Sequence, residues 1–221
     1  MSGPESLGRS LERLKIFPLP TAVLLPGAVV PLHIFEPRYR KMVADALGSD
    51  RLLGLCMLEP GWEPDYHGRP RVRSICGIGR IANEEKLADG RYNLQLIGIG
   101  RAEILEELPP DEPYRVVRAR QPREAVAAGP EQAETLRQAL WALCAKLPED
   151  AASNLAHAGA ALKDPGALAD ICCAALAMEA PVRQKVLEEL SVPKRLQLAL
   201  GVVGEALLQV HDEPDDGGQP N

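Results

Sequence analysis

The chain has 221 residues, a length that fits one large domain or two small ones. Hydrophobic residues make up 46% of it and charged residues 25%, which excludes a disordered chain, a collagen-like fibre and a coiled coil. The net charge of −6 provides no general attraction for phosphate backbones or anionic lipid, so nucleic acid and membrane surfaces are disfavoured as partners.

The N-terminal part of the chain carries no targeting or membrane signal. Residues 1–13 are charged, lack the apolar run of a signal peptide and are expected to form a flexible N-terminus. The stretch from Phe17 to Phe35 has no formal charge, but it contains four prolines that each remove a backbone donor. We therefore expect an extended, buried segment there and no membrane-spanning helix.

Residues 14–123 are expected to form a β-rich lobe, because turn residues separate short apolar runs. The candidate strands are Lys15–Leu19, Val29–Phe35, Leu52–Leu58, Arg71–Ala82, Tyr92–Arg101 and Tyr114–Arg120. Asp89-Gly90 predicts a hairpin turn between the fourth and fifth of them, since glycine tolerates a positive φ. Glu36–Leu47 has the apolar spacing of a short helix instead.

Residues 124–210 are expected to form a helical lobe. Prolines suited to a first helical turn stand at positions 130, 165 and 181, and Ser191 is a candidate N-cap for a long last helix. Trp141 lies beside a leucine stripe and is expected in the core or between the lobes. The acidic, Pro/Gly-rich tail 211–221 is expected to be disordered. Strands followed by helices indicate an α+β fold.

Three motif-like strings have structural explanations. Gly77–Ala82 satisfies G-x-G-x-x-A, but no helix can start there before the Asp89-Gly90 turn, so we interpret its glycines as strand bends. Ser191–Lys194 matches S-x-x-K without the other elements of penicillin-recognising enzymes, and a helix cap explains it. Two arginine-rich stretches, at 69–73 and 115–123, are interpreted as solvent-facing strand residues rather than an RNA site.

Cysteine and histidine patterns contain none of the common metal or cofactor sites. The five cysteines are scattered apart from the adjacent Cys172 and Cys173, which favours reduced thiols in a cytoplasm. The four histidines form no pair of the H-E-x-x-H kind, and no G-x-x-x-x-G-K-[ST] loop occurs. We expect no metal, no cofactor and no catalytic residues.

Several separated segments match one known family in the same order. They are Ile16–Leu19, Val23–Gly27, Val30–Tyr39, Gly77–Ile81, Asp89-Gly90, Gly98–Ala102, Asp164–Asp170, Arg183–Glu188 and Val192–Leu196. Together, over about Leu14 to Val210, they resemble the Lon protease N-terminal, or substrate-binding, domain family.

The resemblance implies a PUA-like β pseudo-barrel followed by a C-terminal α-helical bundle. In full-length Lon proteases this region precedes an ATPase module and a Ser-Lys peptidase domain, and it helps to recognise unfolded or tagged proteins. Neither module is present in this chain. The resemblance therefore implies a free-standing bacterial member that is not an enzyme and takes part in protein quality control.

The scarce aromatic residues narrow the candidate binding residues. Exposed apolar side chains and open strand edges hold extended polypeptide, and loops on a rigid scaffold often carry function. The predicted binding residues are Pro31, His33, Phe35, Tyr39, Trp62, Tyr66 and Arg69. For Phe35 and Tyr39 the alternative is a place in the barrel core.

Three hypotheses about function follow from these residues. The first is a module that binds unfolded or partner polypeptide segments. The second is an adaptor that docks on one folded partner, such as a protease or an ATPase. The third is RNA binding by the PUA-like barrel, which would make affinity fall steeply with salt.

Overall fold

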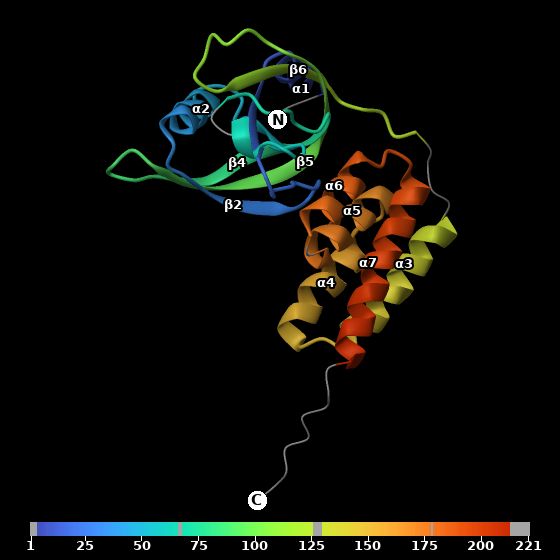
Figure 1. Ribbon diagram of the computed structural model, residues 1–221. Coiled ribbons are helices and arrows are strands. Elements are labelled where there is room, and N and C mark those ends of the chain that lie inside the picture. The colour runs from blue at the N-terminus through green and yellow to red at the C-terminus, as the bar shows by residue number, and fades with distance from the viewer. Residues whose placement is uncertain (1–3, 66–67, 126–129, 178, 213–221) are drawn as a thin grey trace, which may run out of the picture.

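The computed structural model describes residues 4–65, 68–125, 130–177 and 179–212, and shows a β-barrel beside a bundle of helices (Figure 1). The strands are β1 (Leu14–Leu19), β2 (Val29–Ile34), β3 (Leu52–Met57), β4 (Ile75–Lys86), β5 (Tyr92–Glu107) and β6 (Arg115–Arg120). Helices α1 (Pro4–Leu11) and α2 (Pro37–Leu47) and the short 3-10 helix η1 (Glu63–Asp65) accompany them. The bundle contains α3 (Pro130–Cys144), α4 (Glu149–Ala161), α5 (Pro165–Leu176), α6 (Ala180–Glu188) and α7 (Val192–Asp212).

This arrangement confirms the predicted α+β class, with strands first and a helical C-terminal region after them. Each candidate strand is present, although β5 continues six residues past its predicted end at Arg101. Helices α1 and α4 were not predicted. Helix α1 lies inside the expected flexible N-terminus and buries Leu11, and α4 is rich in alanine, so its apolar period is weak. Residues 213–221 of the predicted tail lie outside the described residues.

The barrel closes because β5 pairs with three strands. The six-stranded sheet has the order β2-β5-β4-β3-β1-β6, and β6 also pairs with β5. One edge of β5 pairs with β2 through Tyr92–Ile97 and with β6 through Glu103–Glu107. Strand β2 therefore lies outside the closed circuit of five strands, attached only to β5 within the described part of the sheet.

The glycines of the G-x-G-x-x-A string lie inside β4, as their interpretation as strand bends predicted. Ile78 pairs with Gly100 and Gly79 pairs with Gly98, so the register between β4 and β5 shifts there and Ile99 of β5 is the extra residue of a bulge. A Cβ atom on Gly77 or Gly98 would collide with the carbonyl oxygen of Leu24 or Leu25. These glycines therefore let the segment between β1 and β2 cross directly over the sheet.

That crossing segment joins the barrel to the bundle. Val23 and Leu25 pack in one hydrophobic cluster with Met57 of β3, Ile75 of β4 and buried side chains of the helices, including Leu168 and Leu196. Two further clusters lie within the barrel, one beneath α2 and one beside α1. The barrel and the bundle consequently share part of their core.

A buried ion network also links the two parts. Arg101 of β5 donates two hydrogen bonds to the Asp170 carboxylate of α5, at 2.9 and 2.6 Å, and its Nε donates to the Leu187 carbonyl at 2.9 Å. Arg195 of α7 lies 3.4 Å from the same carboxylate and also pairs with Glu124. Asp170 and Arg195 are almost completely buried, and the Arg195 Nε faces the carboxylate without a hydrogen-bond partner of its own.

Gly77→Ala should destabilise the fold by about 1–3 kcal/mol, because its methyl group would collide with the backbone carbonyl oxygen of Leu24. Gly201→Ala is the matched control, since a Cβ at that site on α7 meets nothing within 4 Å. The control should stabilise by about 0.5–1 kcal/mol through helix propensity. Urea unfolding gives the free energy of unfolding of each variant. Equal values for the two variants would show that the close approach of Leu24 to Gly77 does not constrain the side chain at that position.

Asp170→Ala should destabilise by about 3–5 kcal/mol, because it leaves the buried Arg101 and Arg195 guanidinium groups without their carboxylate. Glu106→Ala removes the exposed partner of Arg118 and should cost less than about 1 kcal/mol. Calorimetry or urea titration compares the two. If Asp170→Ala lowers the free energy of unfolding no more than Glu106→Ala does, the buried ion network contributes little to stability.

Candidate functional site

Three of the predicted binding residues lie together on one face of β2. Val29, Pro31, His33 and Phe35 are exposed, whereas Ile34 is buried against the core. Val29 is 51% exposed and Phe35 60%, so the alternative of a core position is wrong for Phe35. Alternation along a strand explains the shared face, since every second side chain points to the same side.

Strand β5 extends this face. Val29 pairs with Ile97, which shares its face, and Ile99 is the next exposed residue of β5, at 38%. We call the exposed side chains of Val29, Pro31, Phe35 and Ile99, together with the partly buried Ile97, the apolar strip. Isolated exposed apolar residues are ordinary, but several on two paired strands are typical of an interaction surface.

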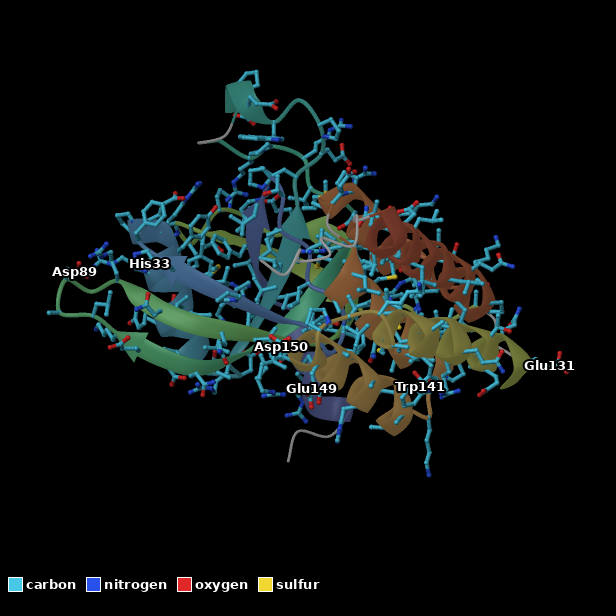
Figure 2. All side chains as sticks on the ribbon, turned by 90° about the horizontal axis from the view of Figure 1, so that it is seen from below. His33, Asp89, Glu131, Trp141, Glu149 and Asp150 are labelled. Carbon is cyan, nitrogen blue, oxygen red and sulfur yellow. The ribbon has the colours of Figure 1, made fainter. Side chains whose placement is uncertain are left out.

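His33 is a polar residue of this face, and its pairing partner Asn93 and Gln95, opposite Pro31, are polar residues that β5 adds to it. Its Nδ1 lies 2.7 Å from Asn93 Oδ1 on β5, and its Nε2 lies 3.4 Å from a guanidinium nitrogen of Arg91. The His33 ring also stacks near Phe35, with 6.3 Å between the ring centres. Arg91 in turn donates to Asp89 at 2.6 Å, so the hairpin turn braces this end of the strip (Figure 2).

The Asp89 carboxylate also accepts a hydrogen bond from the backbone of that turn. The Arg91 N–H donates to the Asp89 carboxylate at 3.0 Å, and this bond holds the pKa of Asp89 below its ordinary value. The Gly90 φ of 84° confirms the reason for glycine in the predicted turn.

At its other end the strip meets a groove between the barrel and the bundle. The inter-lobe groove has a volume of about 420 Å³, and Ile99 is one of its lining residues. Its apolar lining also includes Pro26, Pro122, Leu162 and Ile171, while Arg101, Asp170 and Arg195 form its polar base. Ile99 therefore connects the strip with the groove.

The remaining predicted residues lie elsewhere. Tyr39 is only 5% exposed and packs on Phe17 with 4.4 Å between ring centres, so it belongs to the barrel core. Trp62 is partly buried in the loop around η1, and Arg69 pairs with Glu107 at 2.8 Å. This loop stands apart from the His33 end of β2 (Figure 2). Tyr66 lies outside the described residues.

The exposed tryptophan of the bundle was also misplaced by the sequence analysis. Trp141 is 52% exposed on the outer side of α3, so its expected place in the core is wrong (Figure 2). The buried stripe of α3 is formed by Leu136, Leu140 and Leu143. Trp141 follows Leu140 directly and is rotated away from that stripe by about 100°.

Carboxylates of the neighbouring strand neutralise the positive charge of the arginines on β6. Arg115, Arg118 and Arg120 of β6 pair with Glu107, Glu106 and Glu103 of β5 at 2.7–2.9 Å. The sequence predicts exposed strand residues here but not their partners, which come from a neighbouring strand. Such cross-strand pairs leave little net positive charge for a phosphate backbone.

The described residues contain no group of three or more His, Cys, Asp or Glu side chains that could hold a metal ion. All five cysteines are buried free thiols, and burial raises the pKa of both Cys172 and Cys173 to about 12. Ser191 accepts from the Arg195 N–H at 2.9 Å through its carbonyl at the start of α7. No helix in the described parts of the chain is long and apolar enough to span a membrane.

The free edge of β2 is interrupted by a proline. The Gly98 N–H donates to the Ala28 carbonyl, so alternate residues Val30, Leu32 and Ile34 direct their backbone groups to β5. Pro31 directs its backbone to the free edge, where it has no N–H to offer. Proline at this place is a common device against edge-to-edge pairing.

Val29, Ile97 and Ile99 were missed as candidate site residues. The predicted strand Val29–Phe35 could have indicated Val29, because alternate residues of a strand point to the same face and Val29 is two residues before Pro31. Ile97 and Ile99 required the register between β2 and β5, which a single sequence does not contain.

The sheet, the bundle and their shared core define an α+β protein with a closed five-stranded barrel and a C-terminal helical region. Residues 13–204 match the model of the ATP-dependent protease La (LON) substrate-binding domain. The chain belongs to this family.

Relatives and solved structures agree with that membership. The chain is 29% identical over 206 residues to Lon protease 2 of Sorangium cellulosum, covering 89% of this chain and 25% of that protein. It is 30% identical over 196 residues to a Lon protease of Roseiflexus castenholzii, covering 86% and 23%. The chain thus spans about a quarter of the length of the relatives it matches.

Two solved structures share its fold. The N-terminal domain of Mycobacterium avium complex Lon protease has a TM-score of 0.69 at 22% identity, covering 87% of this chain and 98% of that one. A Lon N-terminal domain protein from Xanthomonas campestris has a TM-score of 0.59 at 23% identity, covering 86% and 97%.

Pro31→Thr should promote self-association through β2, because it restores an N–H on the free edge and adds a β-branched side chain. The expected result is a concentration-dependent dimer or larger species in sedimentation velocity, absent from the unmodified chain under the same conditions. His33→Thr, on the same face, is the control and should not associate. Identical sedimentation of all three proteins would show that Pro31 does not guard the edge.

Proposed function

We propose that this chain is a non-catalytic module that binds extended polypeptide segments, unfolded or part of a partner protein, in protein quality control. The observation that carries the proposal is the apolar strip on β2 and β5, with its continuation through Ile99 into the inter-lobe groove. Membership of a substrate-binding domain family supports it.

The chemistry of the strip suits an extended chain. Side chains of a bound strand-like segment alternate, so every second one would contact Val29, Pro31 or Phe35 while the others face water. Removing apolar surface from water supplies about 25 cal/mol per Å² before the cost of ordering the segment. Binding of this kind depends on apolar side chains and needs no specific sequence.

The proposed contacts fall into two groups. We propose Pro31, His33 and Phe35 as the primary group, since they share the exposed face of β2. Trp62 and Arg69 belong to a separate loop, and we propose them, with Tyr66, as a second contact. Tyr39 would act only by supporting the barrel, because it is buried beneath that surface.

The other functions have less support. The ion pairs on Arg115, Arg118 and Arg120 weigh against RNA binding. A dedicated adaptor would use a similar surface but would select one folded partner. We also propose a cytoplasmic location, consistent with five free thiols.

Phe35→Ser should weaken binding of an unfolded, carboxymethylated model protein about tenfold, because the most exposed aromatic anchor of the strip is lost. Ile99→Asp should have a similar effect by placing a charge where the strip meets the groove. Fluorescence anisotropy measures the affinity, and thermal unfolding verifies that each variant is folded.

Trp141→Ala is the matched control, since it removes an exposed aromatic of similar accessibility from the bundle. Its affinity should stay within twofold of the unmodified chain. Absence of binding by the unmodified chain would contradict the proposal, and a loss with Trp62→Ala but not with Phe35→Ser would move the site to the loop. Recovery of one stoichiometric folded partner would favour the adaptor.

A further inference from the structure

A cationic pocket lies between helix α2 and the tip of the β4–β5 hairpin. It has a volume of about 340 Å³ and is lined by Pro37, Arg40, Lys41, Ala44, Lys86, Gly90 and Tyr92. Three of these side chains are positively charged and none is negatively charged. Such a concentration of positive charge is unexpected by chance in a chain with a net charge of −6.

Two of the three cations have no ion pair within the described residues. Lys41 is occupied by Asp45 at 2.7 Å and by Glu112 at 3.4 Å. Arg40 and Lys86 have no carboxylate within 4 Å in that part of the chain, and Asp89 beside Arg40 is already bound by Arg91. The pocket therefore has unused capacity for an anionic group.

The fold holds both free cations at this pocket. The Arg40 guanidinium lies against Gly90, whose missing side chain provides the space for it. The Lys86 ammonium lies 5.8 Å from the centre of the buried Tyr92 ring, which pairs directly with Lys86 across the sheet. A cation over an aromatic ring in this range is attracted to it.

The pocket is adjacent to one end of the apolar strip. Phe35 belongs to the strip and Pro37 to the pocket, so their Cα atoms are at most about 7.6 Å apart. The opposite wall is the Asp89–Arg91 turn, whose Arg91 reaches His33 on the strip. His33 and Asp89 lie at the same end of the molecule (Figure 2).

We infer that this pocket binds the carboxylate of an acidic residue in a polypeptide that lies along the apolar strip. The inference rests on the proposed function and specifies its substrate class: an extended apolar run flanked by Asp or Glu. Hydrogen bonds from Arg40 and Lys86 to one carboxylate are charge-assisted. The strip supplies apolar contact, and the pocket selects the acidic flank and orients the segment.

The test compares two peptides that share one apolar run and differ only in a Glu or a Gln near one end. The unmodified chain should bind the Glu peptide about three to ten times more tightly at low salt. This ratio should approach one as the salt concentration rises, because the charges are exposed. Fluorescence anisotropy of labelled peptides gives both affinities.

The double variant Arg40→Gln/Lys86→Gln should bring the Glu-to-Gln ratio to one without changing the affinity for the Gln peptide. Lys86→Gln alone, at an exposed position, should lower the ratio in part. Lys163→Gln removes an exposed cation on the bundle and should keep the full ratio.

The outcomes separate the inference from the function on which it rests. Equal binding of the two peptides by the unmodified chain, or a preference that survives in the double variant, overturns the inference and leaves polypeptide binding intact. Binding of neither peptide overturns the proposed function and the inference with it.

Discussion

The contact between Asp170 and two arginines determines how the barrel and the bundle meet. A buried carboxylate is costly unless its charge and its lone pairs are satisfied; here Arg101 of β5 donates hydrogen bonds to it, and Arg195 of α7 adds a second positive charge at 3.4 Å. A bidentate pair tolerates little rotation, so it specifies the orientation of α5 against β5. The inter-lobe groove exists in its present shape because these side chains form its base.

The crossing of Leu24 and Leu25 over the sheet complements that polar contact. Glycines in β4 and β5 let the crossing segment approach the sheet at backbone distance, and Val23 and Leu25 then enter the cluster shared with the helices. The same segment delivers the chain to β2, which attaches to β5 outside the closed barrel. One face of β2 is consequently exposed, which is the geometric origin of the apolar strip.

Strand β2 carries both apolar side chains that can bind polypeptide and a proline that hinders edge-to-edge pairing. The strip offers apolar side chains, while Pro31 interrupts the backbone edge on which another strand would otherwise pair. Polypeptide binding through side chains and protection against edge association are therefore compatible in one strand. The cationic pocket beside α2 adds a polar determinant at one end of the strip. Nothing in this division of roles requires a catalytic group.

The sequence alone was sufficient for the α+β class, the strands, the hairpin at Asp89-Gly90 and the family resemblance, because local periods and turn residues carry that information. Its one set of candidate binding residues contained Pro31, His33 and Phe35, but also Tyr39 and Arg69, which the structure places elsewhere. Helix α4 was missed because its alanines give a weak apolar period, and Trp141 was misplaced because its neighbours form the buried stripe. The partner of Arg101, the position of Arg40 against Gly90, and the place of Ile99 at the groove were decided only by the tertiary structure. Those contacts join residues far apart in the chain, and their geometry depends on strand register and on the docking of two separate lobes.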